Sequence, residues 1–372
     1  MTESASTSAK PPEPLQQLLV ESQQIHGTSL GRDAWRRLRR NWAAVASLVF
    51  LAVLAIASIF TPLLPLQSYK EQNLKERQYE RPNLIKRTLG LWNLLDEPEK
   101  YETRLLQLFE KPNKFDRALI RVRLAVFKDK CLPSLCGTDG LGRDLLSRLF
   151  WGSRVSLTVG VVATLVSLVI GVSYGATAGY LGGWVDEAMM RFVDVLYSIP
   201  FMFVVIFLIS ILDDEVIKNW LLGWGINKIV IFYLVLGAVS WLTMSRIVRG
   251  QVISLKHEQF VEAARAVGAG QARIIFRHLV PNLLGVVIVY LTLTIPSVML
   301  YEAFLSFLGL GVQNPEVSWG KLASEGVRVI NPIEIAWWLV LFPGMALALT
   351  LFALNFLGDG LRDALDPRMK NK

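Results

Sequence analysis

The residues of this sequence that could carry out chemistry are few. A nucleotide phosphate would need a P-loop, but the only Gly-Lys pair, Gly320-Lys321, has Pro315 in place of the first glycine and Leu322 in place of Ser or Thr. No apolar stretch contains paired carboxylates, a histidine cluster or a nucleophile beside a base. We therefore predict no catalytic residues, no metal site and no cofactor bound directly, and a membrane-embedded enzyme is disfavoured.

Six apolar stretches are long enough, or nearly so, to span a bilayer. The 372 residues are 52% hydrophobic and 19% charged, with a mean hydropathy of +0.40, as in a membrane protein. A helix needs about 20 apolar residues to cross the hydrocarbon core, and long unbroken runs exclude a β-barrel. We predict an all-α integral membrane protein with transmembrane helices at residues 42–60, 155–185, 195–212, 229–245, 279–301 and 335–358.

The interiors of these six stretches contain no Asp, Glu, Lys, Arg or His. Ionisable groups inside a bilayer usually mark proton or ion relays. Their absence argues against an ion-coupled carrier, and because the chain has no P-loop, the energy for any transport must come from another polypeptide.

Small residues recur in the second stretch. Gly171, Gly175 and Gly179 are spaced four residues apart, which places them on one helix face. Such a face lets the backbone of a neighbouring helix approach closely. The contact could be plain packing or one that moves.

Lys and Arg gather at span ends that fall on one side of the membrane. They are Arg32, Arg36, Arg37, Arg39 and Arg40 before the first stretch, Arg246, Arg249, Lys256, Arg265, Arg273 and Arg277 between the fourth and fifth, and Arg362, Arg368, Lys370 and Lys372 after the sixth. The positive-inside rule makes this side, with both termini, cytoplasmic. Topology and anionic lipid account for the net charge of +8, so we expect no nucleic-acid partner.

The expected organisation has five parts. Residues 1–41 form a cytoplasmic tail, of which the first 30 are rich in Ser, Gln, Pro and Glu and are predicted to be disordered. About forty mostly polar residues precede the first span, residues 42–61, so it is not a cleavable signal peptide. An external segment (62–151), a transmembrane domain (152–368) and a cytoplasmic C-terminus (369–372) follow.

The external segment is too long to lack structure of its own. Helical spacing of Phe115, Leu119, Val122 and Val126 predicts an amphipathic helix at about 114–129, and residues 101–109 are a second candidate. The segment could form a helical cap that packs on the external face or a docking surface for a partner.

Both cysteines, Cys131 and Cys136, lie in this external segment, on the side where a disulfide could persist. A disulfide between them would close only a small loop and stabilise the fold modestly. A disulfide and two free thiols remain alternatives, while zinc is improbable because no histidine lies near.

The segment from residue 251 to 281 has the pattern of two short helices. Phe260, Ala263, Ala264 and Val267 fall at i, i+3, i+4 and i+7, which predicts a helix with one face of small and apolar residues. Gly268 would end that helix, and a second helix over 271–280 would give way to the fifth span at Pro281. Such a pair could simply lie on lipid head groups.

The same segment resembles the EAA loop of ATP-binding-cassette (ABC) importer permeases. Glu262-Ala263-Ala264-x-x-x-Gly268 is followed after twelve residues by Pro281. The resemblance implies that coupling helices dock in a groove on a separate ATPase subunit, which binds ATP and Mg. The residues implied in this coupling are Glu262, Ala263, Ala264, Arg265, Val267, Gly268 and Pro281.

A motif before the second apolar stretch indicates which subfamily of these permeases the sequence resembles. Thr138 or Asp139 can cap a helix, and Leu141, Leu145 and Leu149 would share one face of it. Residues 137–144 are similar to the GTDxxGRD signature of the C-type permease of dipeptide, oligopeptide and nickel importers. The resemblance implies an external gate or binding-protein contact, with helix capping as the alternative. The residues concerned are Thr138, Asp139, Gly142, Arg143 and Asp144.

Matches to this family extend over roughly residues 137–368. Further examples are Gly182-Gly183-Trp184-Val185-Asp186, Asp194 with Pro200, and Phe307-Leu308-Gly309-Leu310-Gly311. The resemblance implies a type I importer permease fold in the bacterial inner membrane. The implied partners are a B-type permease subunit, two ATPase subunits and an extracytoplasmic solute-binding protein.

The implied function is that of half a translocation pathway, worked by alternating access, for peptides or similar small solutes. A nickel-chelate or other small-solute importer is the alternative. An ion-coupled carrier or one half of an ABC exporter fits the sequence less well.

Overall fold

The computed structural model describes residues 30–85, 87–94, 97–109, 112–212, 214–224, 228–313, 316–330 and 335–365. The predictions made for residues 1–29 and 366–372 lie outside these ranges. In the described part, five helices are long and apolar enough to cross a membrane, and a sixth span is reached if one bent pair counts as a single span. The five helices are α3 (Trp42–Ile59), α6 (Leu145–Leu181), α10 (Lys228–Leu255), α13 (Val280–Phe307) and α15 (Trp338–Leu365).

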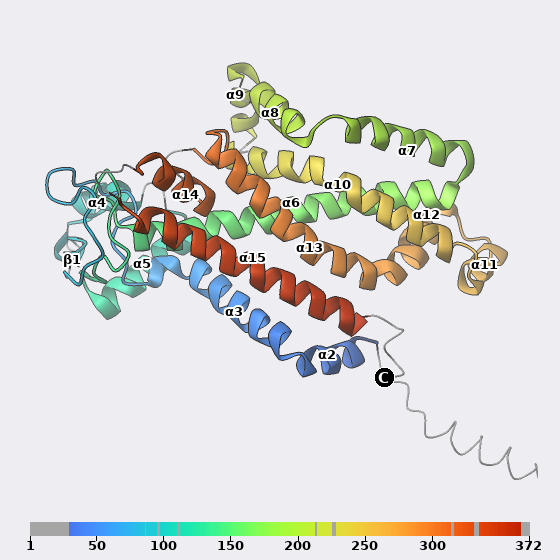
Figure 1. Cartoon of the computed structure of the whole chain (residues 1–372), viewed down its shortest axis with the longest axis horizontal. Helices are drawn as coiled ribbons and strands as arrows, with labels where there is room; N and C mark the ends of the chain where they lie inside the picture. The colour runs from blue at the N-terminus through green and yellow to red at the C-terminus, as the bar shows by residue number, and fades with distance from the viewer. Residues whose placement is uncertain are drawn as a thin grey trace, which may run out of the picture.

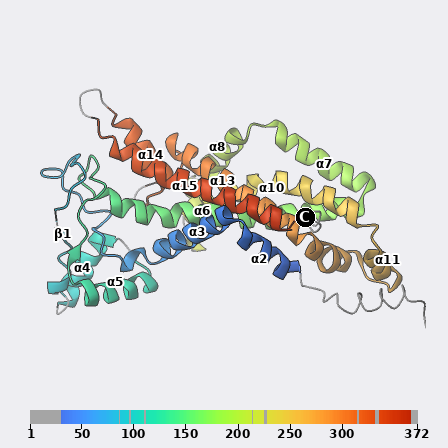
Figure 2. The same ribbon diagram turned by 60° about the horizontal axis from the view of Figure 1, so that its bottom comes forward.

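The long helices run lengthwise beside one another, the segment 183–212 lies along one side of them, and most other short elements gather at the two ends of the bundle (Figure 1). One end, called the α11 end here, carries α2 (Leu30–Arg40), α11 (Gln259–Ala266) and α12 (Gln271–Arg273). The opposite, α4 end carries α4 (Pro98–Phe109), α5 (Lys114–Phe127) and an antiparallel pair, β1 (Arg87–Thr88) with β2 (Lys130–Cys131). Both views agree on this separation (Figure 2). The three basic clusters found in the sequence therefore belong to one end, as far as their residues are described.

The predicted third span, residues 195–212, is not one straight helix. It is divided between α7 (Gly183–Ser198) and α8 (Phe201–Leu212), which meet at an angle of 88°. Pro200 lacks a backbone N–H and disfavours helical geometry in the residue before it. Ile199 accordingly adopts an extended conformation (φ −88°, ψ 125°). The short helix α9 (Glu215–Gly223) follows α8.

The predicted second span, residues 155–185, also has different ends. Helix α6 begins ten residues earlier, at Leu145, and stops at Leu181, because Gly182 (φ +66°) and Gly183 (φ +54°) take left-handed conformations that favour glycine. The apolar criterion missed the first turns because they contain Arg148 and Arg154, whose charges are paired.

Glycines in α6 allow the backbone of α10 to approach closely, as the small-residue spacing predicted. A Cβ atom on Gly171 would lie 2.7 Å from Cβ of Met244, and one on Gly179 would lie 2.8 Å from the carbonyl oxygen of Arg249. A Cβ on Gly175 would overlap the carbonyl oxygen of Ser245. Small residues at such contacts let packing and backbone dipoles hold helices together in lipid.

The segment at the α4 end forms a helical cap. Helices α4 and α5 confirm the two helices predicted there. Leu105, Leu108 and Ile120 are buried in one core with Trp338 and Leu339 at the start of α15. Two 3₁₀ turns accompany these elements. The turn η1 (Thr61–Leu63) follows α3 and leads into the cap, and η2 (Trp92–Leu94) precedes α4 within the cap.

An ion pair fastens this cap to the bundle. The guanidinium of Arg154 in α6 donates two hydrogen bonds, of 2.8 and 3.3 Å, to the carboxylate of Asp116 in α5. Because Asp116 is buried, the pair fixes the cap against α6 in one register.

We expect Gly175→Ala to destabilise the protein by about 1–3 kcal/mol, because the new methyl group forces α6 away from α10. Gly285→Ala is the matched control, since Gly285 also lies within a long helix but a Cβ added there would meet no atom within 4 Å. Thermal unfolding of the purified protein in detergent measures the difference. Equal melting temperatures for the two variants would show that the α6–α10 contact is not tight.

Candidate functional site

The first candidate site is the surface of α11 and the turn that follows it. Val261 is fully buried and packs with Ile274 and Leu279, which anchors α11 to the bundle. Gly268 ends the helix region with φ +82°, as its position in the sequence predicted. Val267, at the tip of the turn, is 88% exposed.

The exposed face differs in one respect from the face predicted. Phe260, Ala263 and Val267 are exposed, but Ala264 is half-buried against the core under α11. Phe276, which the sequence analysis did not include, is 52% exposed. The described α11 end therefore presents Phe260, Ala263 and Val267 along one face of α11, with the small side chain of Ala263 between the two larger ones, and Phe276 is exposed further along the chain.

Charged groups connect this surface to α6. Arg265 pairs with Glu262 at 3.1 Å, and its Nε donates a 3.4 Å hydrogen bond to the hydroxyl of Tyr180 near the end of α6. The Arg265 guanidinium also lies over the Tyr180 ring, 5.3 Å from its centroid, which is within the range of a cation–π contact. These contacts join α11 to the end of α6.

Helix α12 does not give way to the fifth span at Pro281, contrary to the prediction. Residues 271–307 form one 37-residue helix, in which the π-helical turn η3 (Ile274–Leu279) joins α12 to α13. Pro281 has no N–H, and its ring would crowd the carbonyl of Arg277 in a regular helix. The wider π turn directly before it accommodates the ring, so the helix continues.

Two further ion pairs link α7 to α10 near the α11 end. Arg249 makes a bidentate pair with Asp186, with distances of 2.5 and 2.7 Å. Arg246 pairs with Asp194 at 2.6 Å. Asp186 and Asp194 belong to sequence motifs noted above, and the structure gives them arginine partners that the sequence did not reveal.

The second candidate site is a charge network at the α4 end. Asp139 accepts hydrogen bonds from Nε of Arg143 (2.7 Å) and from Nη1 of Arg148 (2.6 Å). Arg148 is 1% exposed, and it also pairs with Glu325 of α14 (Trp319–Arg328) at 2.7 Å. The network thus joins the turn before α6 and the first turns of α6 to α14, and 177 positions separate Arg148 from Glu325 in the sequence.

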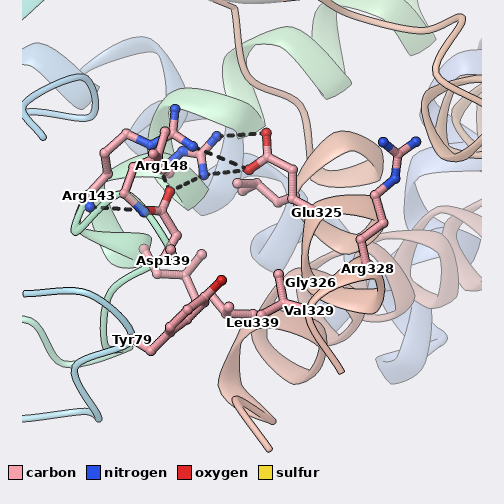
Figure 3. A pocket seen from close by; sticks show the side chains of 13 residues that line it. Tyr79, Asp139, Arg143, Arg148, Glu325, Gly326, Arg328, Val329 and Leu339 are labelled. Atoms are coloured by element: carbon pink, nitrogen blue, oxygen red, sulfur yellow. Dashed lines mark hydrogen bonds and ion pairs between the residues drawn. The ribbon is translucent and has the colours of Figure 1, made fainter. Parts of the chain in front are cut away.

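A cavity of about 400 Å³ opens beside this network. Figure 3 shows Asp139, Arg143, Arg148 and Glu325 grouped on one side of it, with Tyr79 and Leu339 opposite. The cavity therefore has a charged wall and an aromatic and apolar wall.

The other residues of the 137–144 motif are structural. Thr138 accepts a 2.9 Å hydrogen bond from the N–H of Glu80 and donates one to the carbonyl of Arg77. Gly142 has φ +74°, and a Cβ there would overlap the backbone of Asn73. Thr138, Asp139, Gly142 and Asp144 are all buried.

The predicted cap of α6 is corrected by the structure. Asp144, and not Thr138 or Asp139, caps the helix by accepting a 2.8 Å hydrogen bond from the N–H of Ser147. Leu141 lies in the turn before α6, so it shares no helix face with Leu145. Of the five residues predicted to form a gate or a binding-protein contact, Arg143 alone is partly exposed.

Cys131 and Cys136 are buried free thiols, so the disulfide considered from the sequence is not formed. Burial raises the pKa of Cys131 to about 11 and that of Cys136 to about 12. Both thiols are therefore protonated and unreactive at neutral pH.

Sequence reasoning missed Glu302, which directly follows the predicted end of the fifth span. Helix α13 continues to Phe307, and Glu302 is buried within it. Its Oε1 accepts hydrogen bonds of 2.7 Å from Ser306 and from Ser318, which caps α14. The apolar residues at 304, 305 and 307 are the signal that could have shown that the helix continues past residue 301. Because Glu302 lies within α13, the long helices are not free of carboxylates.

Comparison with known proteins decides the family. Residues 167–371, more than half of the chain, match the family described as the binding-protein-dependent transport system inner membrane component. The chain belongs to this permease family. Residues 29–82 also match the N-terminal TM domain of oligopeptide transport permease C.

Relatives of this permease include proteins from several bacteria. It is 40% identical to an oligopeptide transport system permease protein of Haemophilus influenzae over 94% of this chain and 92% of the relative. It is 41% identical to the corresponding protein of Escherichia coli K12, covering 94% of both chains. A dipeptide transport system permease protein of Bacillus subtilis is 37% identical over 92% of this chain and 87% of its own.

Among solved structures, a chain of the MetNI methionine ABC transporter in an inward-facing conformation covers 58% of this chain and 94% of its own, at 19% identity and a TM-score of 0.44. No conclusion depends on that likeness. Family membership confirms the predicted fold class, a helical type I importer permease, and makes the chain a multi-pass inner membrane permease and not an enzyme.

We expect Asp139→Ala to cost about 3 kcal/mol of stability, because it leaves the buried charge of Arg148 with Glu325 as its remaining carboxylate partner. Glu97→Ala is the control, since Glu97 forms an exposed pair with Lys100 at 2.5 Å, and such pairs contribute little. Thermal unfolding of the purified permease compares the variants. Similar small losses in both would contradict a central role for Asp139.

A second prediction concerns pH and Asp144. Burial raises the pKa of this carboxyl to about 6, whereas an unfolded aspartate titrates near pH 3.9. Between these values the folded state holds a proton that the unfolded state has lost, so stability falls as the pH rises through this window. Asp144→Asn keeps a capping side chain and removes the titration.

The melting temperature of the wild-type permease, relative to that of Asp144→Asn, is therefore expected to be higher at pH 4.5 than at pH 7.5. The free-energy change across the window is on the order of 3 kcal/mol. A difference that stays constant with pH would contradict the assigned titration.

Proposed function

We propose that this permease is the C-type subunit of an ATP-driven importer of peptides and forms half of its translocation pathway. The observation that carries the proposal is the exposed face of α11, along which Phe260, the small side chain of Ala263 and Val267 follow one another at helical spacing. Relatives that are 37–41% identical over almost the whole chain are oligopeptide and dipeptide permeases, which supports peptides as the solute.

The α11 surface is proposed to dock in a groove on an ATPase subunit. Large exposed apolar side chains favour a protein interface, and small residues between them permit close approach. Val261 and the Arg265–Tyr180 contact fix α11 to the bundle, so displacement of the docked surface is passed to α6. The continuous helix from α12 to α13 offers a second route.

The proposed assembly contains this chain, a B-type permease subunit, two ATPase subunits that bind ATP and Mg, and an extracytoplasmic solute-binding protein. The α11 end, with the described residues of the basic clusters, is proposed to face the cytoplasm, as are both termini by the positive-inside rule, and the α4 end is proposed to face the binding protein. The binding protein delivers the solute, closure of the ATPase dimer moves the coupling surface, and hydrolysis returns the inward-open state.

At the external end, the proposed role of the 137–144 motif is mainly to position other groups. Thr138, Asp139, Gly142 and Asp144 are buried and shape the turn before α6. Arg143 and the walls of the adjoining cavity are the parts of this motif available to a binding protein or a gate.

We expect Val267→Asp to abolish peptide uptake and the copurification of ATPase subunits, because a carboxylate at an 88% exposed tip would be buried without a partner in the groove. Val126→Asp, at a 65% exposed position of α5, is the control and retains the ATPase subunits. Uptake and copurification are measured in the same membranes, with insertion checked by immunoblot.

Gly268→Pro should have the same effect for a different reason. Its backbone φ of +82° is closed to proline, which is confined to about −65°, so the turn after α11 cannot keep its shape. Normal uptake by Gly268→Pro, or retention of the ATPase subunits by Val267→Asp, would refute the coupling role.

A further inference from the structure

A cavity of about 450 Å³ lies beside the break between α7 and α8, where these helices face α10 and α13. Its walls contain no Asp, Glu, Lys, Arg or His. Hydroxyl groups from three helices line the cavity instead. They belong to Tyr197 of α7, Ser240 and Thr243 of α10, and Tyr290, Thr294, Ser297 and Tyr301 of α13, and those of Tyr197 and Thr243 are hydrogen-bonded to each other at 2.5 Å. We name this site the hydroxyl cavity.

The hydroxyl groups of α13 form a stripe. Residues 290, 294, 297 and 301 are spaced i, i+4, i+7 and i+11, which places them on one face of the helix. Lipid chains offer no hydrogen-bond partner, so a polar stripe in a membrane helix faces protein or a water-filled cavity. The 88° bend at Pro200 also favours a cavity at this place, because broken helices at membrane depth border solute or ion sites.

The stripe offers both donors and acceptors. Thr294 and Ser297 donate their hydroxyl protons to carbonyls of their own helix, at 2.7 and 3.2 Å, which leaves oxygen lone pairs free to accept. The hydroxyls of Tyr290 and Tyr301 make no hydrogen bond to any residue in the described ranges. The Tyr301 ring is held by stacking on Phe201, with centroids 4.2 Å apart.

We propose that the hydroxyl cavity is this subunit's part of the solute pathway and that it binds the main-chain amides of a peptide through uncharged donors and acceptors. The inference rests on the proposed function. Peptides differ in side-chain charge but share their N–H and C=O groups. A charged wall would hold peptides of opposite charge more strongly than other peptides, whereas conduction needs binding weak enough for release. The Arg246 guanidinium, which lies over the ring of the lining residue Tyr197 at 4.1 Å, is paired with Asp194 at 2.6 Å. The neutral lining therefore makes this step respond little to side-chain charge.

The decisive test is to introduce a charge. The complete importer, with its ATPase subunits and binding protein, is reconstituted in proteoliposomes, and uptake is measured for trialanine and for its variants with a central Lys or Glu. Ser297→Asp is expected to lower the ratio of Glu-peptide to Lys-peptide uptake at least tenfold relative to wild type. Ser297→Asn, similar in shape but uncharged, is expected to leave the ratio unchanged.

Removing a donor should act differently. Tyr301→Phe is expected to lower the uptake of all three peptides by a similar factor, roughly fivefold for one net hydrogen bond, because it deletes a main-chain contact. A change confined to one peptide would overturn the main-chain assignment.

Thiol labelling distinguishes the possible occupants of the cavity. Native Cys131 and Cys136 are buried, so the unmodified chain provides a low background. Labelling of Ser297→Cys by a charged methanethiosulfonate, slowed by excess trialanine, supports the proposal. Labelling by a lipid-soluble maleimide alone would show that lipid occupies the cavity, and protection from both reagents would show that the partner permease fills it. Either result overturns the inference.

The outcomes also separate this inference from the proposed function. If wild type takes up peptides and Ser297→Asp keeps the wild-type ratio, the hydroxyl cavity is not the pathway but the peptide importer stands. If wild type takes up none of the peptides, the proposed function itself fails.

Discussion

The close approach of α6 to α10 is the contact on which the rest of the structure depends. Helices in lipid gain little from apolar burial against each other, so their association relies on packing of small residues. Gly171, Gly175 and Gly179 supply that contact along α6. The first turn of the same helix contains Arg148 of the charge network. Its last turn contains Tyr180, whose hydroxyl accepts a hydrogen bond from Arg265 of α11. Both candidate sites are therefore positioned from a single helix that is held in place by its glycines.

Much of this arrangement could be predicted from the sequence, because it follows from local rules. The apolar runs identified the helices, and their order placed the basic clusters at one end. Helical spacing predicted α11 and α5, and Gly268 was identified as the end of a helix from its own conformational freedom. These features depend on neighbours a few residues away, so the sequence contains the information directly.

The features that were missed depend on distant partners. The beginning of α6 was placed too late because Arg148 and Arg154 look like span boundaries, yet each is paired with a carboxylate that the apolar criterion does not see. Glu302 was excluded for the same reason, although Ser306 and Ser318 both donate hydrogen bonds to its Oε1. Pro200 and Pro281 show a further limit: each interrupts an apolar helical pattern, but one produces an 88° bend while the other is absorbed by a π turn. The presence of a proline alone does not distinguish the two outcomes.

The unbroken passage from α12 through η3 into α13 has a mechanical consequence. Its 37 residues correspond to a rod of about 55 Å at the usual rise per residue. A tilt of about 10° at the docking surface would shift the far tip of such a rod by roughly 10 Å. Tyr290 lies near mid-length and Glu302 close to that tip, so displacement would grow along the hydroxyl stripe. A small rotation at the α11 end would therefore grow into a larger displacement along the helix as far as Pro296, where a proline inside the helix permits a kink.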